Sequence, residues 1–394
     1  MAVVRAMLER LAGTRPPSLW LAALLIALAH GAYTAAAGIV MSPDSVTYAY
    51  WSGRMIELGF DYPALLAEAK TTFPPLLYVL FGTLLALLRL VFGEGWAAAL
   101  VLLNLAAHVG LGTLLVRLAV RLTGSAPAGW GALLLFLGCF DLVAWIPYVL
   151  SDPTFVFLAF AVFTLAARRI LVEARRWLPV LGPAALGVFY RPTGMVLIPD
   201  LLWAAYLSRS GRTVRPGPLL AALAAAGLAT ALVFAWFMQD PSRWPLEALS
   251  GAFRTVAGEY ALGEVVSARP ETYHGPPAAL TDYLLISADR FIHFFAIGAA
   301  DFSVAHWLVQ LAFFLPVYGL AGWLAVALWL GRTPFGETER KVFLAAFGAV
   351  LSYALFHALV QVDFDWRYRG PILPHLILLA AGGIAGLVRP ERAR

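Results

Sequence analysis

Apolar runs close to 20 residues long recur along the whole chain, separated by short polar turns and by a few longer polar stretches. A run of this length spans the hydrocarbon core of a bilayer as an α-helix, where the backbone satisfies its own hydrogen bonds. The pattern predicts an all-α polytopic membrane protein with roughly ten to twelve membrane segments. Because no polar stretch is long enough to hold a soluble domain, we expect residues 1–394 to form a single transmembrane domain.

The distribution of arginines predicts which side each polar stretch faces, because positive charge accumulates in inner loops. Three arginines precede the first apolar run, Leu19–Val40, so we expect Met1 inside and this run to be a retained span that crosses outward. The strongest inside signal is a group of four arginines: Arg168, Arg169, Arg175 and Arg176. With both groups inside, Asp152 and three polar stretches are expected on the outer face: 41–74, 239–305, which could include an interfacial helix, and 361–370.

Two regions do not fit simple alternation of crossings. Between residues 75 and 167, one segment cannot cross in the simple way, and Pro75–Phe92 is the candidate because it is short and two prolines, Pro74 and Pro75, stand at its start. Further along, Trp177–Phe189 and Thr193–Leu207 are each short for a full span. We expect that these two helices could dip into the membrane and return, with Arg191 deep within the protein or at the far face.

Composition narrows the class further. The chain is 61% hydrophobic and 13% charged, whereas a soluble domain is about a quarter charged. The net charge of +5 is spread over short loops, where orientation alone would place it, so a nucleic-acid partner is not expected. The single cysteine, Cys139, lies in an apolar run and cannot form an intrachain disulfide.

The outer stretches combine carboxylates, arginines and aromatic residues, which makes them the candidate site. Carboxylates suit general-base work or metal binding, and arginines suit phosphate recognition. Asp44 follows Ser-Pro and Asp152 precedes Pro153, so each also fits a purely structural role at a helix start. Asp44 would then cap a helix beginning at Ser45. Asp152 would start the helix expected over Thr154–Ala167, with Pro153 in its first turn.

The candidate cations carry the same two interpretations. Arg367 and Arg369 flank Tyr368, and in an extended turn the two arginines would share one side while the tyrosine faced the other. They would then contact a lipid phosphate, or else serve as interfacial anchors. Arg54 and Lys70 are candidates for the same role, or solvated loop charges.

Taken together, several short motifs resemble the GT-C superfamily of membrane glycosyltransferases. The resemblance is to the bacterial branch related to protein O-mannosyltransferases and the lipid A aminoarabinose transferase. The segment 43–48 looks like the acidic D-x-x-x-Y motif of the first loop, and 150–155 looks like the second acidic motif. The segment 70–77, KTTFPPLL, is similar to K-P-P-L, although three residues separate the lysine from the first proline. The segment 367–374 resembles R-Y-x-x-P-x-x-P, and 190–194, YRPTG, looks like a family element between two short helices.

The resemblance implies a GT-C-like bundle whose outer loops form an active site on the outer face of the bacterial cytoplasmic membrane. It implies transfer of a sugar from a polyprenyl-phosphate donor to an unidentified lipid, glycan or protein acceptor, with inversion. Asp44 would be the general base, and Asp152 would hold the acceptor or a divalent cation; whether a metal is needed stays open. The cations expected at the donor phosphate are Arg367 and Arg369, followed by Arg54, Lys70 and Arg290. The residues expected at the substrate are Tyr48, Tyr368 and Arg191.

The alternative from another class is a transporter or flippase for a lipid-linked or anionic substrate. Such a protein is expected to show two related halves and charges near the bilayer midplane. In this chain the charges gather in the outer loops and at span ends. That distribution favours chemistry at one membrane face.

Overall fold

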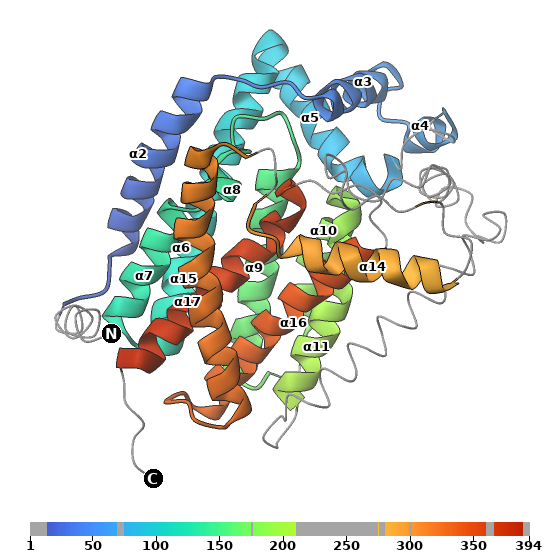
Figure 1. Cartoon of the computed structure of the whole chain (residues 1–394). Coiled ribbons are helices and arrows are strands. Elements are labelled where there is room, and N and C mark those ends of the chain that lie inside the picture. Colours follow the sequence, from blue (N-terminus) through green and yellow to red (C-terminus); the bar gives the residue numbers. More distant parts are fainter. Residues whose placement is uncertain are drawn as a thin grey trace.

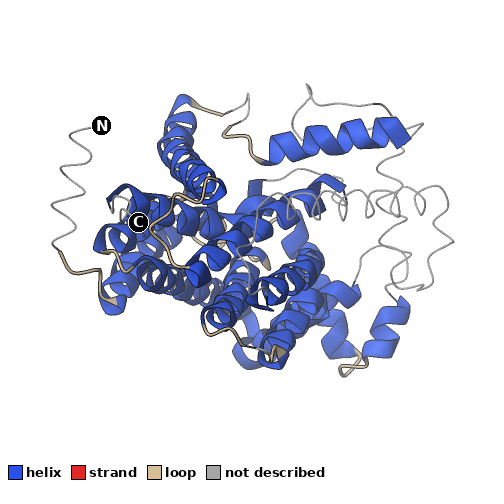
Figure 2. Ribbon diagram, turned by 90° about the horizontal axis from the view of Figure 1, so that it is seen from below, coloured by secondary structure: helices blue, strands red, loops and turns tan. Residues whose placement is uncertain are grey.

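The structure is a computed structural model that describes residues 14–68, 75–174, 176–209, 275, 280–298, 302–359 and 366–388. Within these ranges the chain forms helices and no strand, as Figure 2 shows. One isolated bridge joins Val40 to Tyr148 and ties the end of the first span to the segment that leads into α9. The predicted all-α class is confirmed for this part of the chain.

The described helices are arranged as a bundle (Figure 1). The α-helices are α2 (Leu19–Ala37), α3 (Pro43–Glu57), α4 (Tyr62–Glu68), α5 (Val79–Phe92), α6 (Trp96–Thr123), α7 (Ala126–Leu137), α8 (Phe140–Val143), α9 (Asp152–Leu171), α10 (Leu178–Tyr190), α11 (Leu197–Arg209), α14 (Leu280–Phe294), α15 (Val304–Trp329), α16 (Glu337–Leu359) and α17 (Leu373–Val388). The 3-10 turns are η1 (Pro75–Tyr78), η2 (Gly93–Gly95), η3 (Pro192–Val196) and η6 (Trp366–Ile372).

Six helical stretches in the described ranges are long and apolar enough to cross a membrane. They are Leu19–Ala37, Leu76–Thr123, Asp152–Leu171, Val304–Trp329, Glu337–Leu359 and Trp366–Val388. The protein is therefore a multi-pass helical membrane protein by length and composition. The count of ten to twelve segments stays a prediction, because residues 210–274 lie outside the described residues.

Helix α17 forms the centre of the bundle and is buried along nearly its whole length. It packs against α15, α16, α7 and α6. A Cβ added at Gly383 would lie 2.5 Å from the Leu320 carbonyl oxygen, and one at Gly382 would lie 2.8 Å from side chains of α15 and α16. Small residues let membrane helices approach closely, so these glycines set the tight contact between α15 and α17.

The two short helices α10 and α11 are joined at Arg191 and η3. Each has 13 residues, about 20 Å at 1.5 Å per residue, which is short of a hydrocarbon core of about 30 Å. A Cβ at Gly194 would lie 2.0 Å from the Gly187 carbonyl oxygen, so only glycine fits this turn. Arg191 is buried where α10 ends.

Helix α5 covers most of the segment predicted not to cross. Its 14 residues span about 21 Å, and it packs against α3 as well as α6. It meets α6 near the top of Figure 1 at the η2 turn, where Gly93 has a φ of +53°. A positive φ favours glycine, and the short length fits the prediction that this segment is not a full crossing.

Candidate functional site

The helix that carries Asp44 begins at Pro43 and is capped by Ser42. The Ser42 hydroxyl accepts a hydrogen bond from the Ser45 backbone N–H at 3.3 Å, and the Ser42 N–H donates to the Ser45 hydroxyl at 2.9 Å. This reciprocal arrangement is a capping box. The expectation that Asp44 caps a helix starting at Ser45 is therefore wrong, and its carboxylate has another partner.

That partner is Arg367, from the opposite end of the sequence. Arg367 Nη2 lies 2.6 Å from Asp44 Oδ2. The Asp44 side chain is 42% exposed, whereas that of Arg367 is 13% exposed. The carboxylate is thus held by an arginine from the protein interior and is still open to a molecule from outside.

A second ion pair, Asp152 with Arg191, is buried. Asp152 is the first residue of α9 and Pro153 follows it, so the expected helix start is confirmed. The Asp152 Oδ1 atom also pairs with Arg191 Nη1, and this nitrogen lies 3.3 Å from the Ser151 hydroxyl. A single buried charge is far more costly than one that is paired and hydrogen-bonded. Asp152 therefore does more than open a helix: it neutralises a buried guanidinium.

Tyr368 lies between the two ion pairs. Its ring centroid is 5.2 Å from Arg367 Cζ and 5.8 Å from Arg191 Cζ, within the range of a cation–π contact. The His357 ring stacks on it with centroids 5.1 Å apart. One aromatic ring therefore contacts an arginine from each ion pair.

Tyr48 forms the α3 side of the same region. It lies one turn after Asp44, is buried, and packs its ring against Tyr78 and Phe81, with centroids 5.4 and 5.1 Å away. Burial, and next the neighbouring Tyr78, raise the pKa of the Tyr48 hydroxyl well above its usual value. The charges of Arg191, Asp152 and Asp44 act on the same hydroxyl. Tyr48 is thus a neutral hydroxyl in the field of both ion pairs.

Arg369 points to a different carboxylate. Its Nε donates to Asp141 Oδ2 at 2.6 Å, and its guanidinium lies 4.3 Å from the Phe314 ring centroid and 4.4 Å from that of Trp366. Arg369 is fully buried, and Gln310 on α15 also donates to Asp141. These contacts fit a structural clamp on η6 better than a ligand for a lipid phosphate.

The expectation that Arg367 and Arg369 share one side of an extended turn is therefore wrong. The segment is the 3-10 helix η6, in which three residues complete a turn. Two residues make a rotation of about 240° around the helix axis, so their side chains leave the helix in directions about 120° apart. The two arginines accordingly pair with Asp44 and Asp141.

Asp141 is a buried charge that the sequence analysis missed. It lies in α8, inside the apolar run 129–145. A lone carboxylate in such a run is a signal in itself, because charges at membrane depth are rare and paired. Its partner is 228 residues away in sequence, and the sequence pattern does not name it.

The remaining candidate cations are not part of this cluster or are not described. Arg54 Nη2 pairs with Glu68 at 2.8 Å and its Nη1 pairs with Glu57. Hydrogen bonds to Glu68 and then to Glu57 raise the pKa of the Arg54 guanidinium above its usual value. Arg290 is buried on α14, which packs against α16. Lys70 lies outside the described residues.

The two candidate metal ligands do not form a metal site by themselves. Asp44 and Asp152 each have an arginine as counter-ion, and a shared cation would have to displace both guanidinium groups. No group of three or more acidic, histidine or cysteine ligands occurs among the described residues. Within the part of the chain that the structure describes, the residues around Asp44 and Asp152 therefore do not fit a divalent cation.

The structure thus brings together six of the predicted site residues: Asp44, Tyr48, Asp152, Arg191, Arg367 and Tyr368. They come from α3, α9, η6 and the end of α10. Their arrangement offers an accessible carboxylate, two arginines and aromatic faces within one region. No protein-family model, curated protein or solved structure matches this chain.

Proposed function

We propose that this protein is a membrane glycosyltransferase of the GT-C type. It transfers a sugar from a polyprenyl-phosphate donor to an acceptor at the outer face of a bacterial cytoplasmic membrane. The observation that carries the proposal is the half-exposed Asp44 carboxylate paired with Arg367, next to the buried Asp152–Arg191 pair, in a bundle of membrane-spanning helices.

Asp44 is the base in this proposal. Its exposure lets an acceptor hydroxyl approach the carboxylate, and proton removal by a positioned carboxylate accelerates attack. The acceptor oxygen forms a bond to the anomeric carbon while its proton moves to Asp44. The bond between the anomeric carbon and the phosphate oxygen breaks, and the electron pair leaves with the polyprenyl phosphate.

Arg367 links donor binding to the base. Without the donor, its guanidinium is neutralised by Asp44. A lipid phosphate that approaches Arg367 competes for the same donor groups, since the planar guanidinium binds phosphate through paired hydrogen bonds. Donor binding therefore loosens the hold on Asp44 and stabilises the negative charge that grows on the leaving phosphate.

Arg191 supplies a second positive charge that stays in place during the reaction. It is held by Asp152 and Ser151 and faces the Tyr368 ring. Tyr48 and Tyr368 offer a neutral hydroxyl and aromatic surface, which suit the polar and apolar faces of a sugar. These groups orient the substrate, and Asp44 and Arg367 take part in bond exchange.

The transporter alternative is less well supported by the positions of these charges. Asp44 and Asp152 lie in the first turns of α3 and α9, and Arg191 directly follows α10. A transporter is expected to place its charges near the midplane, between repeated halves. The 42% exposed Asp44 side chain, in the polar stretch 41–74, favours chemistry at one surface.

The test is turnover of a defined donor. The purified full-length protein in lipid nanodiscs is given a panel of synthetic polyprenyl-phosphate sugars, and release of polyprenyl phosphate is measured. We expect release with at least one donor, and a loss of about a hundredfold or more in Asp44→Asn. Absence of release with every donor, together with uptake of a labelled lipid-linked substrate in proteoliposomes, would favour the transporter.

A further inference from the structure

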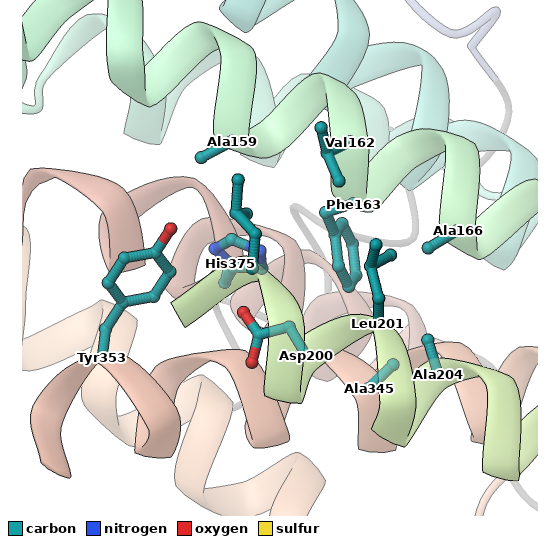
Figure 3. Close-up of a pocket in the computed structure, with 11 residues that line it drawn as sticks. Ala159, Val162, Phe163, Ala166, Asp200, Leu201, Ala204, Ala345, Tyr353 and His375 are labelled. Atoms are coloured by element: carbon teal, nitrogen blue, oxygen red, sulfur yellow. The ribbon is translucent and has the colours of Figure 1, made fainter. Parts of the chain in front are cut away.

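A small cavity lies within the bundle, away from the ion pairs described above. It has a volume of about 20 Å³ and is enclosed by α9, α11, α16 and α17 (Figure 3). Most of its lining is alanine, valine, leucine and phenylalanine, but three polar side chains also reach it: Asp200, Tyr353 and His375. A space of at least roughly 10–15 Å³ is enough for one water molecule.

Each of the three polar groups has an atom that lacks a hydrogen-bond partner within the described residues. These atoms are Asp200 Oδ1, the Tyr353 hydroxyl and His375 Nε2. Tyr353 and His375 are almost completely buried. Buried polar atoms without a partner are rare and destabilising, and here three of them, from three helices, line one cavity.

The hydrogen-bonding roles of these atoms can be assigned. His375 Nδ1 lies 2.9 Å from the Pro371 carbonyl oxygen, which can only accept, so Nδ1 carries the proton. Nε2 of the neutral ring therefore presents a lone pair. Asp200 Oδ1 also accepts, while the Tyr353 hydroxyl can donate. The cavity needs a ligand with two donors and one acceptor.

We propose that this cavity binds one water molecule, which donates to Asp200 and His375 and accepts from Tyr353. Water has two donors and two acceptors, and buried waters typically make about three hydrogen bonds. A metal ion fits less well: Ca²⁺ takes roughly six to eight oxygen ligands and Mg²⁺ needs an octahedral set. Three groups, one of them an imidazole, do not supply that set.

The water site lies next to the elements that carry the candidate site, but the proposal of a bound water does not depend on the proposed glycosyl transfer. Pro371, the partner of His375, belongs to η6, which carries Arg367 and Tyr368. Tyr353 is one helical turn before His357 on α16, and the His357 ring stacks on Tyr368. The bound water therefore fixes α11, α16 and α17 to one another, one helical turn away from His357, whose ring contacts Tyr368.

The experiment combines an experimental structure with thermal unfolding of the full-length protein in detergent. We expect density for one water within about 2.7–3.2 Å of the three atoms. Tyr353→Phe removes the donor and is expected to lower Tm by about 2 °C. The control is Tyr206→Phe, which removes an exposed hydroxyl from α11 and should leave Tm unchanged.

The Asp200→Asn variant distinguishes a bound water molecule from a bound cation. An amide oxygen still accepts from water, so this variant should keep the wild-type Tm, whereas a cation site would lose its only carboxylate. The proposal is overturned if the cavity is dry, if Tyr353→Phe matches the Tyr206→Phe control, or if Na⁺ raises the Tm of the wild type but not that of Asp200→Asn. If Tyr353→Phe does not fold, the density in the wild-type cavity decides.

Discussion

Arg367 Nη2 lies 2.6 Å from Asp44 Oδ2, which joins η6 to the first turn of α3. The two residues are separated by most of the chain, and the contact brings the proposed base and the proposed phosphate ligand together. Because each neutralises the other, a substrate that binds one of them changes the environment of its partner. Predictions for the two residues are therefore coupled.

Replacing Asp44 with asparagine is expected to reduce transfer by at least about a hundredfold, because general-base catalysis contributes roughly 10²–10⁴ in rate. Folding should be retained, since Ser42 and Ser45 cap α3. The measurement is release of polyprenyl phosphate, with Tm recorded alongside. Glu94→Gln, in the exposed η2 turn, is the matched control. Near-normal turnover in Asp44→Asn would leave Asp44 as a structural partner of Arg367 only.

The substitutions at Arg367 test whether charge or shape matters at the phosphate. Arg367→Lys keeps a positive charge but loses the planar fork, so it should impair donor binding and turnover less than Arg367→Ala does. Arg332→Ala, at an exposed position after α15, is the control for loss of one arginine. If Arg367→Ala binds and turns over the donor as well as Arg332→Ala does, the phosphate site lies elsewhere.

The pattern of apolar runs predicts the long helices well, because burial in lipid leaves few other structures open to such runs. The predicted first span, Leu19–Val40, corresponds to α2 (Leu19–Ala37), and the two short segments Trp177–Phe189 and Thr193–Leu207 correspond to α10 (Leu178–Tyr190) and α11 (Leu197–Arg209). The polar stretch 41–74 is predicted as an outer loop with a helix that begins at Ser45; the structure has that helix as α3, beginning at Pro43, and adds α4. The many charged and aromatic residues of this stretch make its apolar periodicity hard to see, although α3 is half-buried and its Ser52 and Met55 face inward.

Side-chain partners are less predictable than the helices. The motifs single out Asp44, Asp152 and Arg367, but the Asp44–Arg367 and Asp152–Arg191 pairs depend on how distant helices pack. Asp141 is the clearest example: the apolar run 129–145 contains no other charge, so nothing near Asp141 in the sequence indicates that Arg369 is its partner. The direction of Arg369 depends on the 3-10 geometry of η6, which proline at position 371 alone does not predict.

The buried Asp152–Arg191 pair predicts an unusual result for a double variant. Asp152→Ala alone leaves the Arg191 guanidinium buried without its counter-ion, and breaking such a pair costs about 3–5 kcal/mol. Replacing both, as in Asp152→Leu with Arg191→Met, removes both charges and should recover much of the stability. Transfer should stay lost, because the second cation is gone. Thermal unfolding and donor turnover check the two parts, and a double variant less stable than Asp152→Ala would contradict the pairing.

The buried pair of Asp141 and Arg369 predicts that one substitution, Asp141→Asn, lowers both the thermal stability and the affinity for the donor, although neither residue is part of the Asp44–Arg367 pair. Asp141→Asn weakens the hold on a fully buried guanidinium that also stacks on Phe314 and Trp366. Because breaking a buried pair is far more costly than breaking an exposed one, Asp141→Asn should lower Tm much more than Arg54→Ala, which breaks the exposed pairs with Glu57 and Glu68.

The same substitution is expected to weaken donor binding. Arg369 fixes η6, so the loosened clamp also lets Arg367 move, and KM for the donor should rise. Equal Tm values for Asp141→Asn and Arg54→Ala would show that the clamp contributes little, and a lower Tm with an unchanged KM would show that it does not position Arg367.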